Sequence, residues 1–404
     1  MATAPHARIS DPLPLPCGVV LPNRIVKAAM SDSLGDGAGH GTPEQARLYE
    51  RWAHGGAAAS IVGEVQGSPD FPERPGNLVV NDRVDQTALQ AMLHRATANS
   101  HQLWAQLGHA GALAHPPISD PAGPSDLTDA GVACRALTVA ELKDVPAAFA
   151  QTAVACKDLG FTGVEIHAAH GFLLSQFLSP LFNRRGDAFG GSLKNRARLL
   201  HDTIAAVRAA VGPSFPVALK LNATDQIDGG FTEPEALAVI ADLKAGGEAG
   251  GVDLIDMSGG TYFPGAKSSS DGAKPGPYFL AFGREARPIA PCPIMLTGGF
   301  KSRADAANAL ATGAADAVGL ARLLVLDPNL PNRWLTDETA SSPRAPRFEK
   351  TVPGGVTAWH TMRLTALAND QEAQFAMDLP EAFDAMEARD EHRCIKWNAA
   401  FGRS

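Results

Sequence analysis

The 404-residue sequence has few cysteines, no long uncharged apolar run and no excess of basic residues. Its five cysteines are widely spaced and form no C-x-x-C pair, which argues against a zinc or iron–sulfur site and favours a reducing compartment. No window approaches about 18 uncharged apolar residues, and the N-terminus lacks the apolar core of a signal peptide. We therefore expect a cytoplasmic protein with no metal centre and no membrane partner.

The charged residues are scattered, with 35 Lys and Arg against 43 Asp and Glu, for a net charge of −8. Without a basic stripe to follow a phosphate backbone, nucleic acid is not an expected partner. The composition is 45% hydrophobic and 19% charged, which is ordinary for a globular protein and excludes disorder over the whole length.

Eight short apolar runs, rich in β-branched residues, alternate with stretches of helical periodicity. The clearest helix has Leu200, Ile204, Val207 and Val211 on one face. Parallel strands need helical crossovers, so this alternation predicts an α/β protein with a (β/α)₈ TIM barrel, while an open doubly wound sheet stays an alternative. The predicted strands are Arg24–Ala29, Ala58–Val62, Gln102–Leu107, Gly163–His167, Val217–Leu221, Leu254–Met257, Ile294–Thr297 and Ala317–Leu320.

The alternation stops after Asp327-Pro328. We therefore expect a barrel domain over residues 1–335 and a C-terminal extension over 336–404 that packs on the barrel or on a partner subunit, which is compatible with a homo-oligomer. The predicted helices outside the 200–211 segment are Pro43–His54, Arg83–Ser100, Thr138–Leu159, Glu233–Lys244, Ser302–Ala311, Ala358–Phe375 and Pro380–His392.

Two histidines form the strongest local signal. The fourth strand delivers His167 to its carboxyl end, and His170 follows three residues later. Two imidazoles at this spacing can donate hydrogen bonds to one substrate oxygen. The same pair is also consistent with structural hydrogen bonds or with a metal pair, although no third ligand stands nearby in the sequence.

Two further features lie at strand ends. Lys220 interrupts an apolar strand, and a buried ammonium needs an anionic partner, which can be a reduced flavin or a carboxylate on a neighbouring strand. Gly298 and Gly299 close the seventh strand, and Ala321-Arg322 follows the eighth. Barrels commonly bind phosphate between these two strands, so we interpret the four residues as a phosphate site.

The chain resembles the old yellow enzyme family of FMN-dependent NAD(P)H oxidoreductases from about Pro22 to Pro328. The matching segments are Leu21–Met30, Ala105–Gly111, Gly163–Pro180, Asn183–Asp187, Gly190–Ser192, Asn195-Arg196 and Ser258–Gly260. No single segment is decisive, but their order and spacing over three hundred residues are specific to the family.

The resemblance assigns a role to each candidate residue. It implies a small-molecule substrate whose oxygen is bound by His167 and His170. The expected FMN-binding residues are Ala28, Ala29 and Met30 at the flavin edge, Ser31 near O4, Glu64 beside the ring, Gln106 and Lys220 at the pyrimidine, and Gly298, Gly299, Ala321 and Arg322 at the phosphate. The resemblance also implies a ping-pong reaction in which NADH or NADPH reduces FMN, and hydride then passes from N5 to an α,β-unsaturated carbonyl.

This sequence departs from the family at the expected proton donor. The family usually has Tyr two residues after the second His or Asn, and here that position is Phe172, which has no proton to give. A flavin-dependent isomerase or dehydrogenase without net alkene reduction is therefore an alternative. Glu64, at a position often small and uncharged, is a solvated or paired residue, a replacement acid, or a group that binds a cation.

Two functions outside this chemistry also stay open from the sequence. An aldolase or isomerase barrel would use Lys220 as a Schiff base. A non-catalytic FMN-storage protein would bind the flavin without being reduced by NADH.

Overall fold

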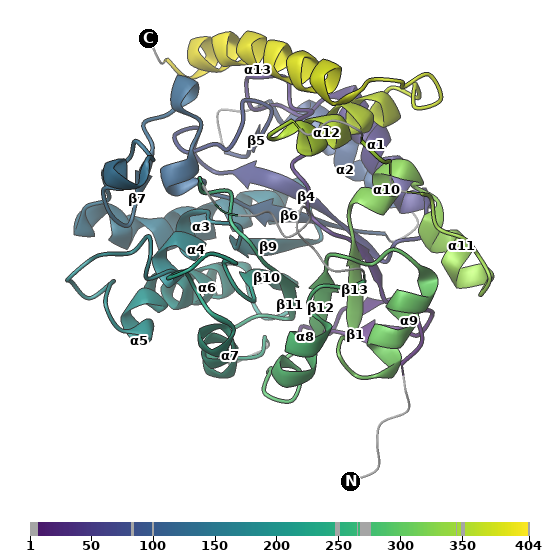
Figure 1. Cartoon of the computed structure of the whole chain (residues 1–404), viewed down its shortest axis with the longest axis horizontal. Coiled ribbons are helices and arrows are strands. Elements are labelled where there is room, and N and C mark those ends of the chain that lie inside the picture. Colours follow the sequence, from purple (N-terminus) through teal and green to yellow (C-terminus); the bar gives the residue numbers. More distant parts are fainter. Residues whose placement is uncertain are drawn as a thin grey trace.

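The computed structural model describes residues 7–81, 85–98, 101–246, 251–264, 266, 276–344, 346–348 and 352–402. Eight parallel strands form a closed barrel with helices around its outside (Figure 1). The barrel strands are β3 (Ile25–Lys27), β4 (Ala59–Gln66), β6 (Gln102–Leu107), β9 (Gly163–Ala168), β10 (Val217–Asn222), β11 (Leu254–Ser258), β12 (Ile294–Thr297) and β13 (Ala317–Leu320).

Closure of the barrel depends on the first and last strands. β3 pairs in parallel with β13 on one side and with β4 on the other. The predicted barrel is therefore confirmed and the open doubly wound sheet is excluded. A short strand, β5 (Leu78–Val79), adds to β4 outside this ring, and β7 (Ala122–Gly123) pairs with β8 (Arg135–Ala136) in a separate sheet.

One end of the barrel is closed by an N-terminal hairpin of β1 (Leu13–Pro14) and β2 (Val20–Leu21). Leu13, Leu15 and Leu21 are buried in one apolar cluster with barrel residues such as Trp104 and Met295. A plugged end leaves the carboxyl ends of the strands as the face on which a site can form, as in other barrels of this class.

The helices pack their apolar faces against the outside of the strands. In α6 (Arg198–Val211) the predicted stripe of Leu200, Ile204, Val207 and Val211 is buried. The other helices before the extension are α1 (Pro43–His54), α2 (Gln86–Ala96), α3 (Val139–Leu159), α4 (Leu173–Leu178), α5 (Leu193–Arg196), α7 (Glu233–Asp242), α8 (Leu280–Ala286), α9 (Arg303–Ala311), α10 (Arg322–Leu326) and α11 (Leu330–Thr336). The expected helix bounds Arg83 and Ser100 lie outside the described residues.

The second barrel strand is longer than the sequence indicates. The apolar run ends at Val62, but β4 continues to Gln66, and its register against β6 shifts between Val62 and Val65. Such an irregularity redirects the side chains of a strand. It brings Glu64, which the apolar pattern places beyond the strand, into the barrel wall.

The C-terminal segment forms α12 (Gly355–Ala368) and α13 (Leu379–Phe401). The expected helix to Phe375 was wrong, because the chain leaves the helix at Asn369 and Asp370 takes a left-handed φ of 56°. The expected end at His392 was also too early, since α13 contains no Gly or Pro after its first turn until Gly402.

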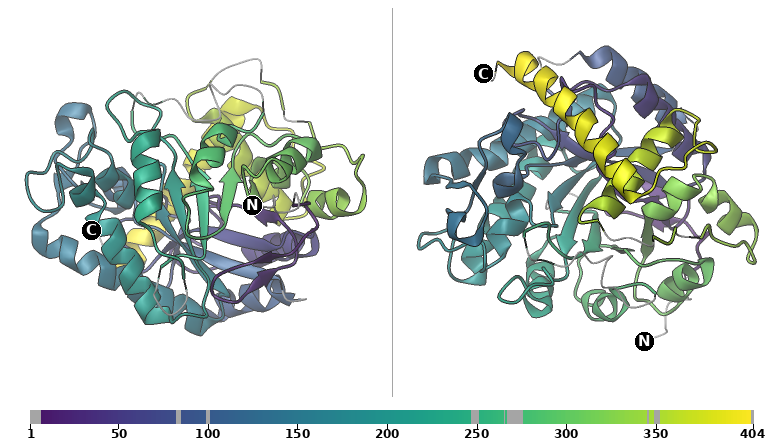
Figure 2. Two further views of the ribbon diagram at one scale, coloured as in Figure 1. Left: turned by 90° about the horizontal axis from the view of Figure 1, so that it is seen from below. Right: turned by 45° about the horizontal axis from the view of Figure 1, so that its top comes forward.

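These helices lie against the barrel, and α13 follows one side of it (Figure 2, yellow). Arg393 donates to the carbonyl of Ser33, Arg74 pairs with Glu387 at 3.4 Å, and Asn398 donates to the carbonyl of Pro117. Ser33, Arg74 and Pro117 follow β3, β4 and β6, so α13 contacts three loops at the carboxyl end of the barrel.

The boundary between residues 335 and 336 stays a prediction. No helix in the described part of the chain has the length and apolarity needed to span a bilayer.

Candidate active site

The two predicted histidines meet at the carboxyl end of β9. His167 Nε2 is 3.1 Å from His170 Nδ1, and the ring planes cross at 71°. His170 has a positive φ of 60°, and its backbone N–H donates to Asn222 Oδ1 on β10. The neighbouring strand thus holds the turn that places the second imidazole beside the first.

The imidazoles form the middle of a polar row. Glu64 Oε1 lies 2.7 Å from His167 Nδ1, a short contact whose angle does not meet hydrogen-bond geometry, and His170 Nε2 lies 2.8 Å from Ser258 Oγ. Burial raises the pKa of the Glu64 carboxyl to about 8, and the Lys220 ammonium only partly opposes this shift. Burial also holds the pKa of both imidazoles well below the usual range. These directions describe a row of uncharged groups at neutral pH.

An aromatic rim adjoins the row. The Phe172 ring meets the His167 ring edge-on at a centroid distance of 4.8 Å. Tyr262, from the loop after β11, has its ring centroid 5.9 Å from that of His170 and 6.0 Å from that of Phe172. Tyr262 was not among the residues expected from the sequence.

Lys220 has an anionic partner on the next strand. Its Nζ is 2.5 Å from Asp256 Oδ2, and Asp256 Oδ1 accepts a hydrogen bond from Thr297. Gln106 donates to Glu165 Oε2 at 2.5 Å. Burial lowers the pKa of Lys220, but the carboxylates of Asp256 and Glu165 outweigh burial and raise it above the usual value. The strand carboxylate considered from the sequence is therefore present, and a charged amine disfavours the Schiff-base alternative.

The segment that follows β3 lies close to the main chain of β4 and to a side chain of β6. The segment Ala28–Ser31 follows β3, and Ser31 forms an isolated bridge with Gly63 of β4. A Cβ added at Gly63 would lie 3.1 Å from both Met30 O and Gln106 Oε1. The main chain of β4 therefore lies directly against two of the residues expected to contact a flavin.

The predicted phosphate residues directly follow the neighbouring strands β12 and β13. Gly298 and Gly299 have φ values of 116° and 80°, a region that favours glycine. Added Cβ atoms there would lie 3.1 Å and 2.8 Å from the Tyr278 ring. Ala321 is the N-cap of α10, and Arg322 is its first residue. The four residues thus stand at the carboxyl ends of two adjacent strands.

Several polar residues of this region were missed in the sequence. Glu165 and Asp256 are acidic residues inside apolar strands, the same signal that drew attention to Lys220. Ser258 and Tyr262 stand at and just beyond the Ser-Gly-Gly segment after the sixth barrel strand. The sequence does show that Ser258 and Tyr262 stand near the carboxyl end of a strand. It does not show the direction in which the loop after that strand runs.

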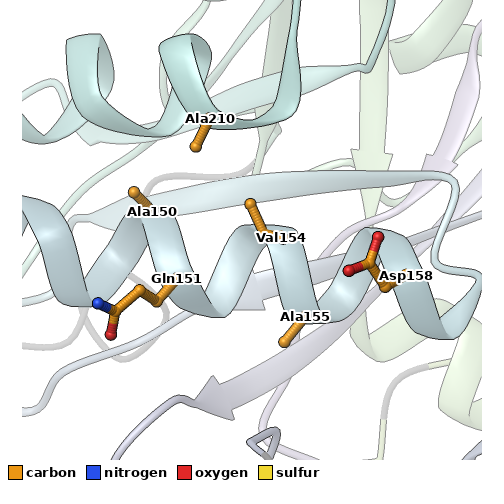
Figure 3. A pocket seen from close by; sticks show the side chains of 6 residues that line it. All are labelled: Ala150, Gln151, Val154, Ala155, Asp158 and Ala210. Carbon is orange, nitrogen blue, oxygen red and sulfur yellow. The ribbon is translucent and has the colours of Figure 1, made fainter.

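A separate surface hollow of about 350 Å³ lies between α3 and α6 (Figure 3). It is lined by Ala150, Gln151, Val154, Ala155, Asp158 and Ala210. The hollow lies on the outer wall of the barrel, away from the strand ends that carry the histidines. Its mainly aliphatic lining offers no pair of groups for acid–base or redox chemistry.

The closed barrel, with the polar row at the carboxyl ends of its strands, has the architecture of a barrel enzyme. Residues 11–338 match the model of the NADH:flavin oxidoreductase / NADH oxidase family, and the chain belongs to this family. The expected old yellow enzyme relationship, with FMN as cofactor and a nicotinamide as hydride donor, is thereby confirmed, and the family and its curated relatives are described as using NADH.

Curated relatives and solved structures agree with this placement. The chain is 32% identical to the NADH-dependent flavin oxidoreductase iliE of Hypocrea jecorina, over 84% of this chain and 93% of the relative. It is 33% identical to iliE of Neonectria sp. over 85% of this chain, but spans only 48% of that relative. The fold is similar to that of morphinone reductase in complex with tetrahydroNAD, with a TM-score of 0.70, 23% identity and coverage of 84% and 93%.

Proposed function

We propose that this enzyme passes hydride from NADH to an α,β-unsaturated carbonyl or a related electron-poor substrate whose oxygen is bound by His167 and His170. The observation that carries the proposal is the pair of imidazoles, 3.1 Å apart at the carboxyl end of a barrel strand, with His167 buried and His170 half-buried. Neutral imidazoles donate N–H groups without adding charge, which suits a carbonyl oxygen that becomes negative during reduction.

The residues at the barrel mouth fit FMN. Among the described residues, Glu64 Oε2 and Glu165 Oε1 are buried without a hydrogen-bond partner, and a polar ring system beside them would supply one. In this proposal, Gln106 and Lys220 hold the pyrimidine side, Gly298, Gly299, Ala321 and Arg322 hold the phosphate, and Ala28, Ala29, Met30, Ser31 and Glu64 contact the ring. Bound FMN supplies the two-electron chemistry that no side chain provides.

The histidine row changes when substrate binds. In the structure, His170 Nε2 already contacts Ser258, and His167 Nε2 contacts His170. A substrate oxygen takes over at least one of these N–H donors. Glu64 remains behind His167, with Oε1 2.7 Å from Nδ1, so the ring donates to the substrate from its other side, Nε2.

The alternative function is that of a flavin-dependent isomerase or dehydrogenase. It is favoured by Phe172, which occupies the expected donor position and lies 3% exposed against His167 without an acidic hydrogen. Without an acid, hydride that reaches the substrate can return, and no saturated product accumulates.

One anaerobic experiment separates these functions. Purified holoenzyme is titrated with NADH while the flavin absorbance is followed, and 2-cyclohexenone is then added. Stoichiometric cyclohexanone supports alkene reduction, whereas reoxidation without saturated product, or isomerised product alone, favours the alternative. A yellow protein that NADH does not bleach would contradict both.

The substrate role of the histidines has its own test. Binding of p-hydroxybenzaldehyde is followed through the long-wavelength absorbance band that a phenolate gives when it stacks on flavin. We expect the variants His167→Ala and His170→Ala to keep FMN but to bind this phenolate at least about 10-fold more weakly, since each removes one charge-assisted hydrogen bond. Unchanged affinity in both variants would contradict the assignment.

The proposal also covers the cellular setting. We propose a cytoplasmic enzyme that acts on small molecules, without nucleic acid or membrane partners, and that is compatible with a homo-oligomeric assembly. The five cysteines are free thiols, four of them buried, which supports a reducing compartment.

A further inference from the structure

The loop after β11 is fastened to the histidine turn by its main chain. The backbone N–H of Tyr262 donates to the carbonyl of His170 at 3.0 Å, and Thr261 forms an isolated parallel bridge with His170. Gly171 allows this approach, because a Cβ there would lie 2.0 Å from Thr261 Oγ1. Tyr262 is therefore held beside the two histidines and does not depend on side-chain contacts alone.

The residues on either side of Tyr262 anchor the loop. Thr261 and Phe263 are buried, and the Phe263 ring stacks on Phe182 with centroids 3.8 Å apart and planes at 15°. In extended chain, alternate side chains point in opposite directions. Tyr262, 58% exposed, is directed away from these anchors, and its ring lies near His170 and Phe172.

Ionisable groups from several strands of the barrel influence the Tyr262 hydroxyl. Desolvation raises the pKa of the phenol to about 12, and Glu73 and Glu64 add to this shift while Arg322 and Lys220 oppose it. The exposed fraction averages over the whole residue, whereas the pKa follows the surroundings of the hydroxyl. The phenol therefore carries its proton at neutral pH, and two cations are near enough to stabilise the phenolate formed when the proton leaves.

We propose that Tyr262 is the catalytic acid of the reductive reaction and replaces the donor that Phe172 cannot be. This inference rests on the proposed function. Hydride originating from NADH adds to the β-carbon of the enone and leaves an enolate, whose oxygen accepts hydrogen bonds from the histidines. The Tyr262 O–H bond then breaks and a C–H bond forms at the α-carbon. Water returns a proton to the Tyr262 phenolate, so each turnover consumes one hydride and one proton.

The assignment makes Tyr262→Phe a selective variant. It keeps the ring and the loop, so we expect unchanged FMN content and an unchanged rate of flavin reduction by NADH. Formation of cyclohexanone from 2-cyclohexenone should fall by about 10²-fold or more, the usual contribution of a positioned acid. In the double variant Tyr262→Phe, Phe172→Tyr, a phenol returns at the neighbouring ring position, and part of the rate should return with it.

A second measurement does not require hydride transfer. Oxidised holoenzyme is incubated with cyclohexanone in D₂O at alkaline pH, where part of Tyr262, with its pKa of about 12, is the phenolate that can accept an α-proton. The α-deuterium in excess of an enzyme-free control is measured by mass spectrometry. We expect exchange in the wild type and its loss in Tyr262→Phe, with recovery in the double variant.

The outcomes distinguish the two proposals. A wild type that forms no cyclohexanone overturns the proposed alkene reduction, and the exchange measurement still decides the role of Tyr262. Cyclohexanone formation within about 2-fold of the wild type in Tyr262→Phe, a difference below about 0.5 kcal/mol, would overturn the assignment. Equal exchange in both proteins, including none in either, would overturn it as well.

Discussion

Replacing the buried Glu64 carboxyl by an amide tests the electrostatics of the site. Glu64 is 3% exposed, and burial raises its pKa from 4.5 to about 8. A raised pKa means that the folded chain binds this proton more tightly than the unfolded chain. The associated stability is fully present below pH 4.5 and is lost as the pH rises through about 8.

The size of the effect follows from the shift. One pKa unit corresponds to about 1.36 kcal/mol. Compared with a side chain that stays neutral, an ionisable Glu64 therefore lowers the free energy of unfolding by roughly 1 kcal/mol at about pH 5 and by roughly 4 kcal/mol at about pH 8. Glu64→Gln removes the ionisation and keeps the side-chain volume. We therefore expect the free energy of unfolding of the variant, relative to the wild type, to rise by about 3 kcal/mol between these two pH values.

Urea unfolding of both holoproteins at the two pH values measures this difference, with FMN at one fixed saturating concentration. The exposed Glu285 on α8 provides the control, because Glu285→Gln should keep the pH dependence of the wild type. If Glu64 is instead ionised and paired with a His167 imidazolium, Glu64→Gln will lose stability by about 3 kcal/mol or more at neutral pH. Such a loss of stability would contradict the conclusion that the row of Glu64 and the two histidines is uncharged. Unchanged turnover and substrate range in this variant would further show that Glu64 takes no part in the reaction.

Two other substitutions test the barrel interior and the extension. Asp256→Asn removes the partner of the buried Lys220 ammonium and should lower the free energy of unfolding by about 3 to 5 kcal/mol in urea, with recovery in the double variant Asp256→Asn, Lys220→Met. A loss below about 1 kcal/mol would mean that water or another group solvates Lys220. Trp397→Ala empties a fully buried position where α13 packs on Val79 and Ile118, and should cost about 3 to 5 kcal/mol while unfolding stays a single transition. A separate early transition in the wild type would show that the extension unfolds independently of the barrel.

The elements of the barrel were predictable because their burial is periodic. Parallel strands buried on both faces appear as continuous apolar runs, and all eight were located by such runs. Among the helices between them, α6 shows a clear apolar stripe. The errors fell where the pattern carries no information: β4 runs past its apolar segment to Gln66, and α12 ends before Phe375.

The site was only partly predictable for a related reason. A strand places a residue such as His167 or Lys220 at a known height in the barrel, because side chains alternate along a strand of known direction. A loop has no such period, and Tyr262 reaches the histidines only because its main chain pairs with that of the β9 loop. The partner of a buried charge is likewise a matter of register, which pairs Lys220 with Asp256 rather than with another acid.

The sequence by itself determined the fold class, the family and the strand ends at which chemistry is expected, because hydrophobic periodicity and local motifs are properties of neighbouring residues. Only the tertiary structure decided that the barrel closes through β3, that Lys220 is paired, that Glu64 lies behind His167 and that Tyr262 faces the same space as Phe172. These are contacts between residues 30 to 300 positions apart. Their geometry depends on strand register and loop pairing, which no local sequence pattern encodes.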